Sequence, residues 1–192
     1  MSHKNRCPNF VKLMTQHLQG AGKVIKGNIY ESKGKKLIQN GLKMLKKNTE
    51  NWHRAMVHVT ESEVEGLKFK HLWEEHVALE GQYIEAVFHC HCKTKDFGQC
   101  NSAQAAKEAI EGLSTNGAAV TEWFSDHLSE SHRQQWTDYW IIHLQCVKDT
   151  IDTGKLVKCK FRTLKDFRER AKHCIKLGQD LGHLLNTVHH CE

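Results

Sequence analysis

Proline is almost absent from this chain of 192 residues, because Pro8 is the only one. A protein of this size that is rich in strands or loops normally uses several prolines to interrupt its elements. Nothing from Asn9 onward therefore prevents long helices. We predict an all-α fold, an antiparallel helical bundle or coiled coil of three to five long helices with a basic amphipathic helix at the N-terminus.

Long hydrophobic runs are missing as well. No stretch approaches the ~20 apolar residues that a membrane-spanning helix needs, and the polar start leads into no apolar signal-peptide core. We therefore expect an intracellular, cytoplasmic protein, with peripheral membrane contact left open. In that compartment the eight cysteines, none of which form a CxxC pair, are expected to be buried thiols rather than a disulfide framework.

Enzyme signatures are absent too. The chain has no GxGxxG, no phosphate-binding GxxxxGK[ST], no GxSxG and no HExxH. Three tryptophans at helical spacing, Trp123, Trp136 and Trp140, are typical of a core, and they would otherwise line a hydrophobic ligand cavity. We expect a non-enzymatic protein.

Hydrophobic periodicity divides the chain into helices. Apolar residues recur four and three apart over residues 38–59 and again over 72–90, which is the spacing of a coiled-coil seam. Similar patterns predict helices over 9–30, 103–151 and 162–190, the second of these with a possible interruption at 114–117. The predicted organisation is a basic amphipathic segment over residues 1–31, followed by one helical bundle over 32–192.

The connection near Thr60 decides the architecture. A capping box of Thr60 and Glu63 would end one helix and start another, giving a compact bundle of four or five helices. A single helix over residues 33–95 would instead be roughly 95 Å long. Such a rod would need a second copy of the chain to cover its apolar face, and this alternative predicts a homodimer.

Charge is unevenly distributed. Residues 1–50 carry a net charge of +9, residues 51–153 carry −8, and residues 154–192 carry +5. The basic ends either pair with the acidic middle of the same chain or meet an anionic surface. The densest basic run contains no acidic residue and consists of Lys35, Lys36, Lys43, Lys46 and Lys47.

These observations favour a self-associating helical scaffold that binds an anionic surface, with a membrane as the preferred partner. Membrane-curving helical dimers of the BAR type share this architecture, although no motif is shared. We do not expect a nucleic-acid partner, because the basic segments carry few aromatic residues for stacking on bases.

Fifteen histidines raise the alternative of a metal-binding bundle. The run from His89 to Cys92, with Cys100 beyond it, offers imidazole and thiolate ligands for zinc or copper. Three carboxylate–histidine pairs also stand one helical turn apart, and such pairs can hold iron inside a bundle. They are His71 with Glu75, His76 with Glu80, and His89 with Glu85.

The first of these pairs belongs to a wider pattern over residues 71–132. The stretch His71-Leu-Trp-Glu-Glu75 resembles the HxxxE helix of hemerythrins, and the stretches 83–89 and 122–127 are similar to later helices of that family. The resemblance implies a di-iron site. The positions that carry over residue by residue are His71, Glu75, His89 and His127.

Overall fold

The computed structural model describes residues 7–30, 34–90, 92, 100 and 102–189. These residues form six α-helices and no strand, so the all-helical prediction is confirmed. The helices in chain order are α1 (Phe10–Ile29), α2 (Gly34–Thr60), α3 (Glu63–His89), α4 (Ala103–Ser125), α5 (Glu130–Lys158) and α6 (Leu164–Val188).

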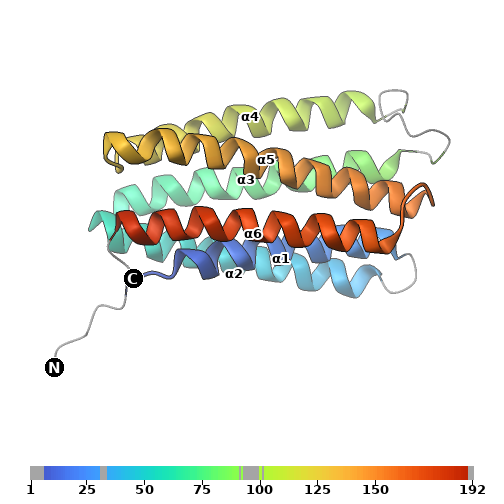
Figure 1. Ribbon diagram of the computed structural model, residues 1–192, viewed down its shortest axis with the longest axis horizontal. Coiled ribbons are helices and arrows are strands. Elements are labelled where there is room, and N and C mark those ends of the chain that lie inside the picture. The colour runs from blue at the N-terminus through green and yellow to red at the C-terminus, as the bar shows by residue number, and fades with distance from the viewer. Residues whose placement is uncertain (1–6, 31–33, 91, 93–99, 101, 190–192) are drawn as a thin grey trace.

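The helices lie side by side along one axis (Figure 1). Each helix packs against its neighbours in sequence, and α6 returns to pack against α1, so the bundle closes on itself. The backbone N–H of Phe10 at the start of α1 donates to Oδ1 of Asn186 near the end of α6. Contacts of α5 with α1 and with α3 cross the interior of the bundle. Three alternate helices therefore meet along its middle.

Polar side chains mark the helix starts. Asn9, Ser62 and Thr163 each accept a hydrogen bond from a backbone N–H in the first turn of the helix that follows. Thr163 and Asp166 form a complete capping box. The chain turns between α2 and α3 at Glu61, which has a φ of 52°. The alternative of a helical break near Thr60 is thus the one that the structure adopts. The expected capping box of Thr60 and Glu63 is wrong, because Ser62 is the N-cap of α3.

The described helices number six, against the three to five expected. The additional break lies at residues 126–129, and residues 114–117 continue α4 without interruption. Asn116 is accommodated inside the helix because its amide donates to the Leu72 carbonyl and to Glu75. Gly117 fits because it has no side chain. A Cβ there would lie 2.8 Å from Leu144 and 3.0 Å from Trp140, so glycine allows α5 to pack closely at this position.

The core consists of two apolar clusters along the bundle axis. One is rich in aromatic residues and contains Met14 of α1, Trp73 of α3 and Trp140 of α5. The other contains Leu18, Tyr83 and Cys146 of the same three helices. On each of these helices the buried residues between the two clusters are polar, so a polar layer crosses the core halfway along the bundle.

Two other sequence-based expectations concern the domain boundary and membrane-spanning helices. The predicted domain boundary at residue 31 falls outside the described residues, and α1 itself packs against α2 and α6. None of the helices in the described part of the chain is both long and apolar enough to cross a membrane.

Two glycines of α1 provide a test of the close packing between α1 and α2. We expect Gly27→Ala to lower the free energy of unfolding by ~1–3 kcal/mol, because the new Cβ would lie 2.5 Å from Ile38 and 2.8 Å from the Gly34 carbonyl oxygen. Gly22→Ala is the matched control, since no atom lies within 4 Å of its Cβ position. Urea unfolding should show that this control gains up to ~1 kcal/mol. If both substitutions lowered the free energy of unfolding, or both raised it, the result would contradict the described packing.

Candidate metal centre

The polar layer consists of four side chains, His17, His76, Glu80 and His143. Glu80 is 2% exposed and the three histidines are fully buried. His17 comes from α1, His76 and Glu80 come from α3, and His143 comes from α5. Ionisable residues are rarely buried this deeply unless they are paired or bind an ion.

The helices explain how the four residues meet. His76 and Glu80 are one turn apart, so both project from the same face of α3. His17 and His143 each lie near the middle of their helices, among apolar residues that face the core. Because α5 contacts both α1 and α3 in the interior, the three inward faces converge at one level of the bundle.

One ligand atom from each of the four residues lies within 4.8 Å of the other three. Glu80 Oε1 is 3.2 Å from Nε2 of His17 and 3.2 Å from Nε2 of His76. Ligands of a tetrahedral zinc ion at ~2.1 Å are separated by ~3.4 Å. The carboxylate and these two imidazoles are therefore already at the spacing of a shared metal ion.

The hydrogen bonds of this cluster are incomplete. Among the described residues, neither ring nitrogen of His143 has a hydrogen-bond partner, and Nδ1 of His17, Nδ1 of His76 and Oε2 of Glu80 also lack one. Buried polar atoms in proteins are almost always satisfied, and an exception calls for an explanation such as an ion. Elsewhere in the core, both polar atoms of the buried Asn48 side chain are used, with the Leu13 carbonyl and the Trp73 indole as partners.

The protonation states of His143 and Glu80 at pH 7 are those that can bind a metal ion. Burial, together with the charges of His17 and His76, lowers the pKa of His143 to about 3, so this imidazole is neutral at pH 7. Burial by itself would raise the pKa of Glu80, but the neighbouring His17 and His76 outweigh it and lower that pKa well below its usual range. A neutral imidazole and an ionised carboxylate are the forms that bind metal ions.

Aromatic rings surround the cluster. The Trp73 ring lies 5.0 Å from that of His17 and 5.3 Å from that of His76. The Trp140 ring lies 5.2 Å from that of His76 and 5.1 Å from that of His143. This apolar shell excludes water, and it strengthens the electrostatic attraction between an ion and its ligands.

The four metal ligands expected from the hemerythrin resemblance lie elsewhere. The His71 side chain is 76% exposed and faces Glu74, and Glu75 accepts a hydrogen bond from Asn116. His89 is exposed at the end of α3, and His127 stacks on Trp123 in the turn after α4. Within the described part of the chain, these residues do not form a common group of metal-ligand atoms.

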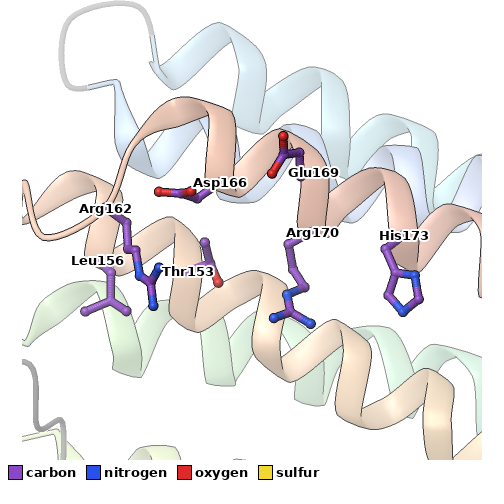
Figure 2. A pocket seen from close by; sticks show the side chains of 7 residues that line it. All are labelled: Thr153, Leu156, Arg162, Asp166, Glu169, Arg170 and His173. Carbon is purple, nitrogen blue, oxygen red and sulfur yellow. The ribbon is translucent and has the colours of Figure 1, made fainter.

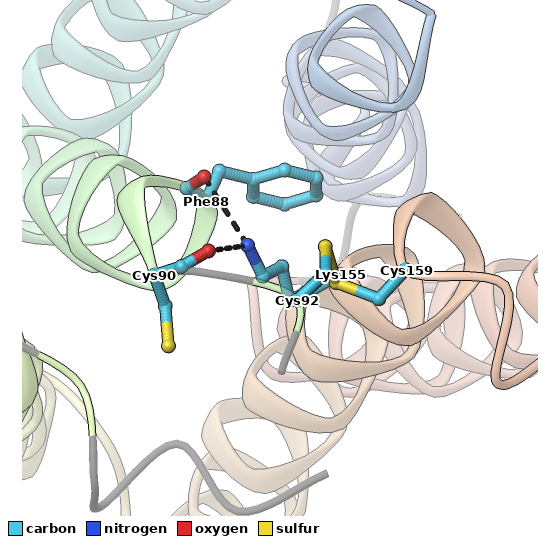
Figure 3. The surroundings of a disulfide bond; sticks show 5 residues. All are labelled: Phe88, Cys90, Cys92, Lys155 and Cys159. Carbon is cyan, nitrogen blue, oxygen red and sulfur yellow. Dashed lines mark hydrogen bonds between the residues drawn. A yellow bond between two sulfur atoms is a disulfide. The ribbon is translucent and has the colours of Figure 1, made fainter. Parts of the chain in front are cut away.

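The cysteine–histidine run at the end of α3 lies only partly within the described residues. His91 lies outside the described residues. Cys92 forms a disulfide with Cys159, so the expectation of a free thiol is wrong for this pair. Figure 3 shows the disulfide beside Lys155 of α5, whose ammonium group donates to the carbonyl oxygens of Phe88 and Cys90. Lys155 thus caps the C-terminal end of α3, the helix that carries His76 and Glu80.

Apart from this cluster, a surface hollow of about 350 Å³ lies between α5 and α6. Figure 2 shows Arg170 and His173 pointing from α6 toward α5. Asp166 and Glu169 also line this hollow, and Arg170 is paired with Asp149 at 3.5 Å. Its charges are mixed and its polar groups are exposed, so it does not specify a ligand.

No protein-family model, no curated protein and no solved structure matches this chain. The candidate site is therefore defined by its own geometry.

One of the three carboxylate–histidine pairs noted in the sequence, His76 with Glu80, is part of the centre. His76 and His143 also occupy apolar seam positions, and that was the signal that could have identified them. His17 gives the same signal, because Phe10, Met14, His17, Ala21 and Val24 are also four and three apart. The pairing of α1 with α3 and α5 is still needed to bring it to the other ligands.

The pKa shifts predict how acid affects the metal-free protein. Unfolded His143 takes up a proton near pH 6.5, whereas the folded side chain does so only near pH 3, so the contribution of this residue to stability is lost as the pH falls between these values. The lowered pKa of Glu80 also makes the folded protein lose stability as the pH falls. We expect the free energy of unfolding of chelator-treated protein to fall by up to ~1.4 kcal/mol per pH unit from this histidine.

Urea unfolding at several pH values measures this slope. His143→Leu should show a shallower dependence, because the proton uptake by unfolded His143 is removed. The exposed His173→Leu change should leave the dependence as in the wild type. Equal slopes for wild type and His143→Leu would contradict the neutral, buried state of His143.

Proposed function

We propose that this protein binds one first-row transition metal ion in its core, through the imidazoles of His17, His76 and His143 and the carboxylate of Glu80. The observation that supports the proposal best is the set of four buried ligand atoms within 4.8 Å of one another. Several polar atoms of the same four side chains have no hydrogen-bond partner among the described residues. The proposed function is that of a metal-binding helical bundle, and the proposal includes no catalytic role.

Zinc is the ion that this ligand set suits best. Imidazole nitrogen and carboxylate oxygen are both ordinary zinc ligands, and four of them complete the tetrahedral shell of a closed site. Iron is the alternative, because imidazoles and carboxylates also suit it. With three neutral imidazoles and one carboxylate, the site compensates half of the charge of a divalent ion.

A bound ion would connect three helices that are distant in sequence. His17 and His143 are separated by most of the chain, and the ion would join them to α3 through two ligands in consecutive turns. Because the unfolded chain does not present such a site, the binding free energy would contribute to folding stability. The polar layer, which is costly to bury without a ligand, would then hold the three helices together through the metal ion.

Metal analysis tests this proposal. Protein stripped with a chelator, incubated with Zn²⁺ and desalted should retain about one zinc per chain, as a single four-ligand site requires, and should melt at a higher temperature than the stripped protein. His143→Leu and Glu80→Gln should each abolish or strongly reduce retention. Both changes preserve approximate side-chain volume, so circular dichroism can confirm that the variants are folded.

The exposed His71→Ala variant is the control, and it should bind zinc as the wild type does. Loss of zinc in this variant with retention in His143→Leu would move the site to the hemerythrin-like positions. Wild-type protein that takes up neither zinc nor iron would leave the polar layer as a buried ion pair, and the proposed function would fail.

A second proposed function is binding to an anionic membrane surface through α2. It is supported by the placement of the five lysines of the dense basic run, all of which are exposed. At about 100° per residue they fall within an arc of about 120° on one side of the helix. Within the described residues, no ion pair is formed by Lys35, Lys36, Lys43, Lys46 or Lys47.

We restrict this second proposal to a single molecule. The predicted coiled-coil homodimer rested on one long helix over residues 33–95, whereas α2 and α3 are separate helices that pack against each other. Leu42, one of the expected seam residues, is 52% exposed and borders the lysine face. An apolar side chain at that edge would reach the interfacial region of a bilayer.

Vesicle sedimentation tests the lysine face. The protein should co-sediment with vesicles rich in phosphatidylserine and not with neutral ones, with ~1 kcal/mol per lysine near the surface and weaker binding at high salt. Changing Lys43, Lys46 and Lys47 to Glu should abolish sedimentation. The matched control changes Lys165, Arg168 and Lys172 of α6 to Glu. Equal loss in both variants would show that net charge, and not the α2 face, determines binding.

A further inference from the structure

Two cysteines lie in the same apolar cluster of the core, on two helices that pack against each other. Cys146 is on α5, one turn after His143, and Cys174 is on α6. Both are buried in the apolar cluster that borders the polar layer. The helices α5 and α6 pack against each other, and the two thiols are close enough to act on each other as hydrogen-bond partners.

The remainder of the chain indicates an oxidised state. Cys92 is already bonded to Cys159, and Cys7 is disulfide-bonded as well. Structural disulfides form and persist under oxidising conditions and are rare in reducing compartments. Two thiols in contact within a chain that carries such bridges are exposed to the same oxidant while the chain folds.

We propose that Cys146 and Cys174 are a disulfide-forming pair, and that their bond fastens α5 to α6 beside the polar layer. This inference does not depend on the proposed metal function. The oxidant is a small-molecule disulfide. One cysteine thiolate attacks it and releases one small thiol, and the second cysteine then attacks the mixed disulfide and releases the other. The chain loses two hydrogens and two electrons, and both pass to the two released thiols.

The expected bridge has a structural consequence for α5. Cys92–Cys159 joins the end of α5 to the segment after α3, close to Lys155 (Figure 3). Cys146–Cys174 would hold the middle of α5 against α6, one turn from His143. The helix that supplies the third imidazole would then be fixed at two points along its length.

Peptide mapping of the full-length protein tests the proposal. The chain is refolded in a buffer of oxidised and reduced glutathione, alkylated in denaturant without reductant, and digested with trypsin. Cleavage after Arg133, Lys148, Lys172 and Lys176 places Cys146 in a peptide of residues 134–148 and Cys174 in one of residues 173–176, with no other cysteine in either. We expect these two peptides to be recovered as one disulfide-linked species, which separates when reductant is added.

Cys146→Ser is the matched variant. It should lose the linked species and leave Cys174 alkylated, and reductant should lower its melting temperature by less than that of the wild type. Recovery of both wild-type peptides separately, each fully alkylated, would overturn the proposal. So would a stable link from Cys146 or Cys174 to any other cysteine of the chain.

Discussion

The structure depends on one constraint, the burial of four ionisable side chains in the middle of an apolar core. His17, His76, Glu80 and His143 separate two hydrophobic clusters that would otherwise be continuous. Burying such groups costs several kcal/mol unless charge and hydrogen bonds compensate, and here the compensation is incomplete. An ion held by these four ligands, as proposed, would remove this cost and join α1, α3 and α5 at this level.

The division of roles among the helices follows from this arrangement. The three helices α1, α3 and α5 supply the polar layer, and the three between them, α2, α4 and α6, complete the enclosure. The lysine face lies on α2, away from the polar layer. The cysteine pairs instead lie on helices of the centre or next to them, where a covalent bond can hold a ligand-bearing helix in place. The two proposed functions thus involve different parts of the molecule and can be tested separately.

Much of the fold follows from local sequence, and the centre does not. One proline and the four-and-three spacing of apolar residues are sufficient to predict helices, and their bounds agree closely for α1 and α6. Asn116 and Gly117 were read as a possible break because tertiary contacts that permit them within α4 cannot be read from the sequence. The pair His76 and Glu80 was visible, but three pairs shared that spacing. Burial distinguishes them, and burial depends on packing between helices far apart in sequence. The resemblance to hemerythrins pointed to His71 and Glu75, which are exposed.

Anomalous X-ray scattering from a crystal of zinc-loaded protein, measured on both sides of the zinc absorption edge, tests the central claim most directly. The account predicts one strong peak between α1, α3 and α5, at ~2.0–2.2 Å from an imidazole nitrogen of His17, His76 and His143 and from a carboxylate oxygen of Glu80. A map with no peak among these four residues, or with its strongest peak at an exposed histidine such as His71 or His89, would contradict it.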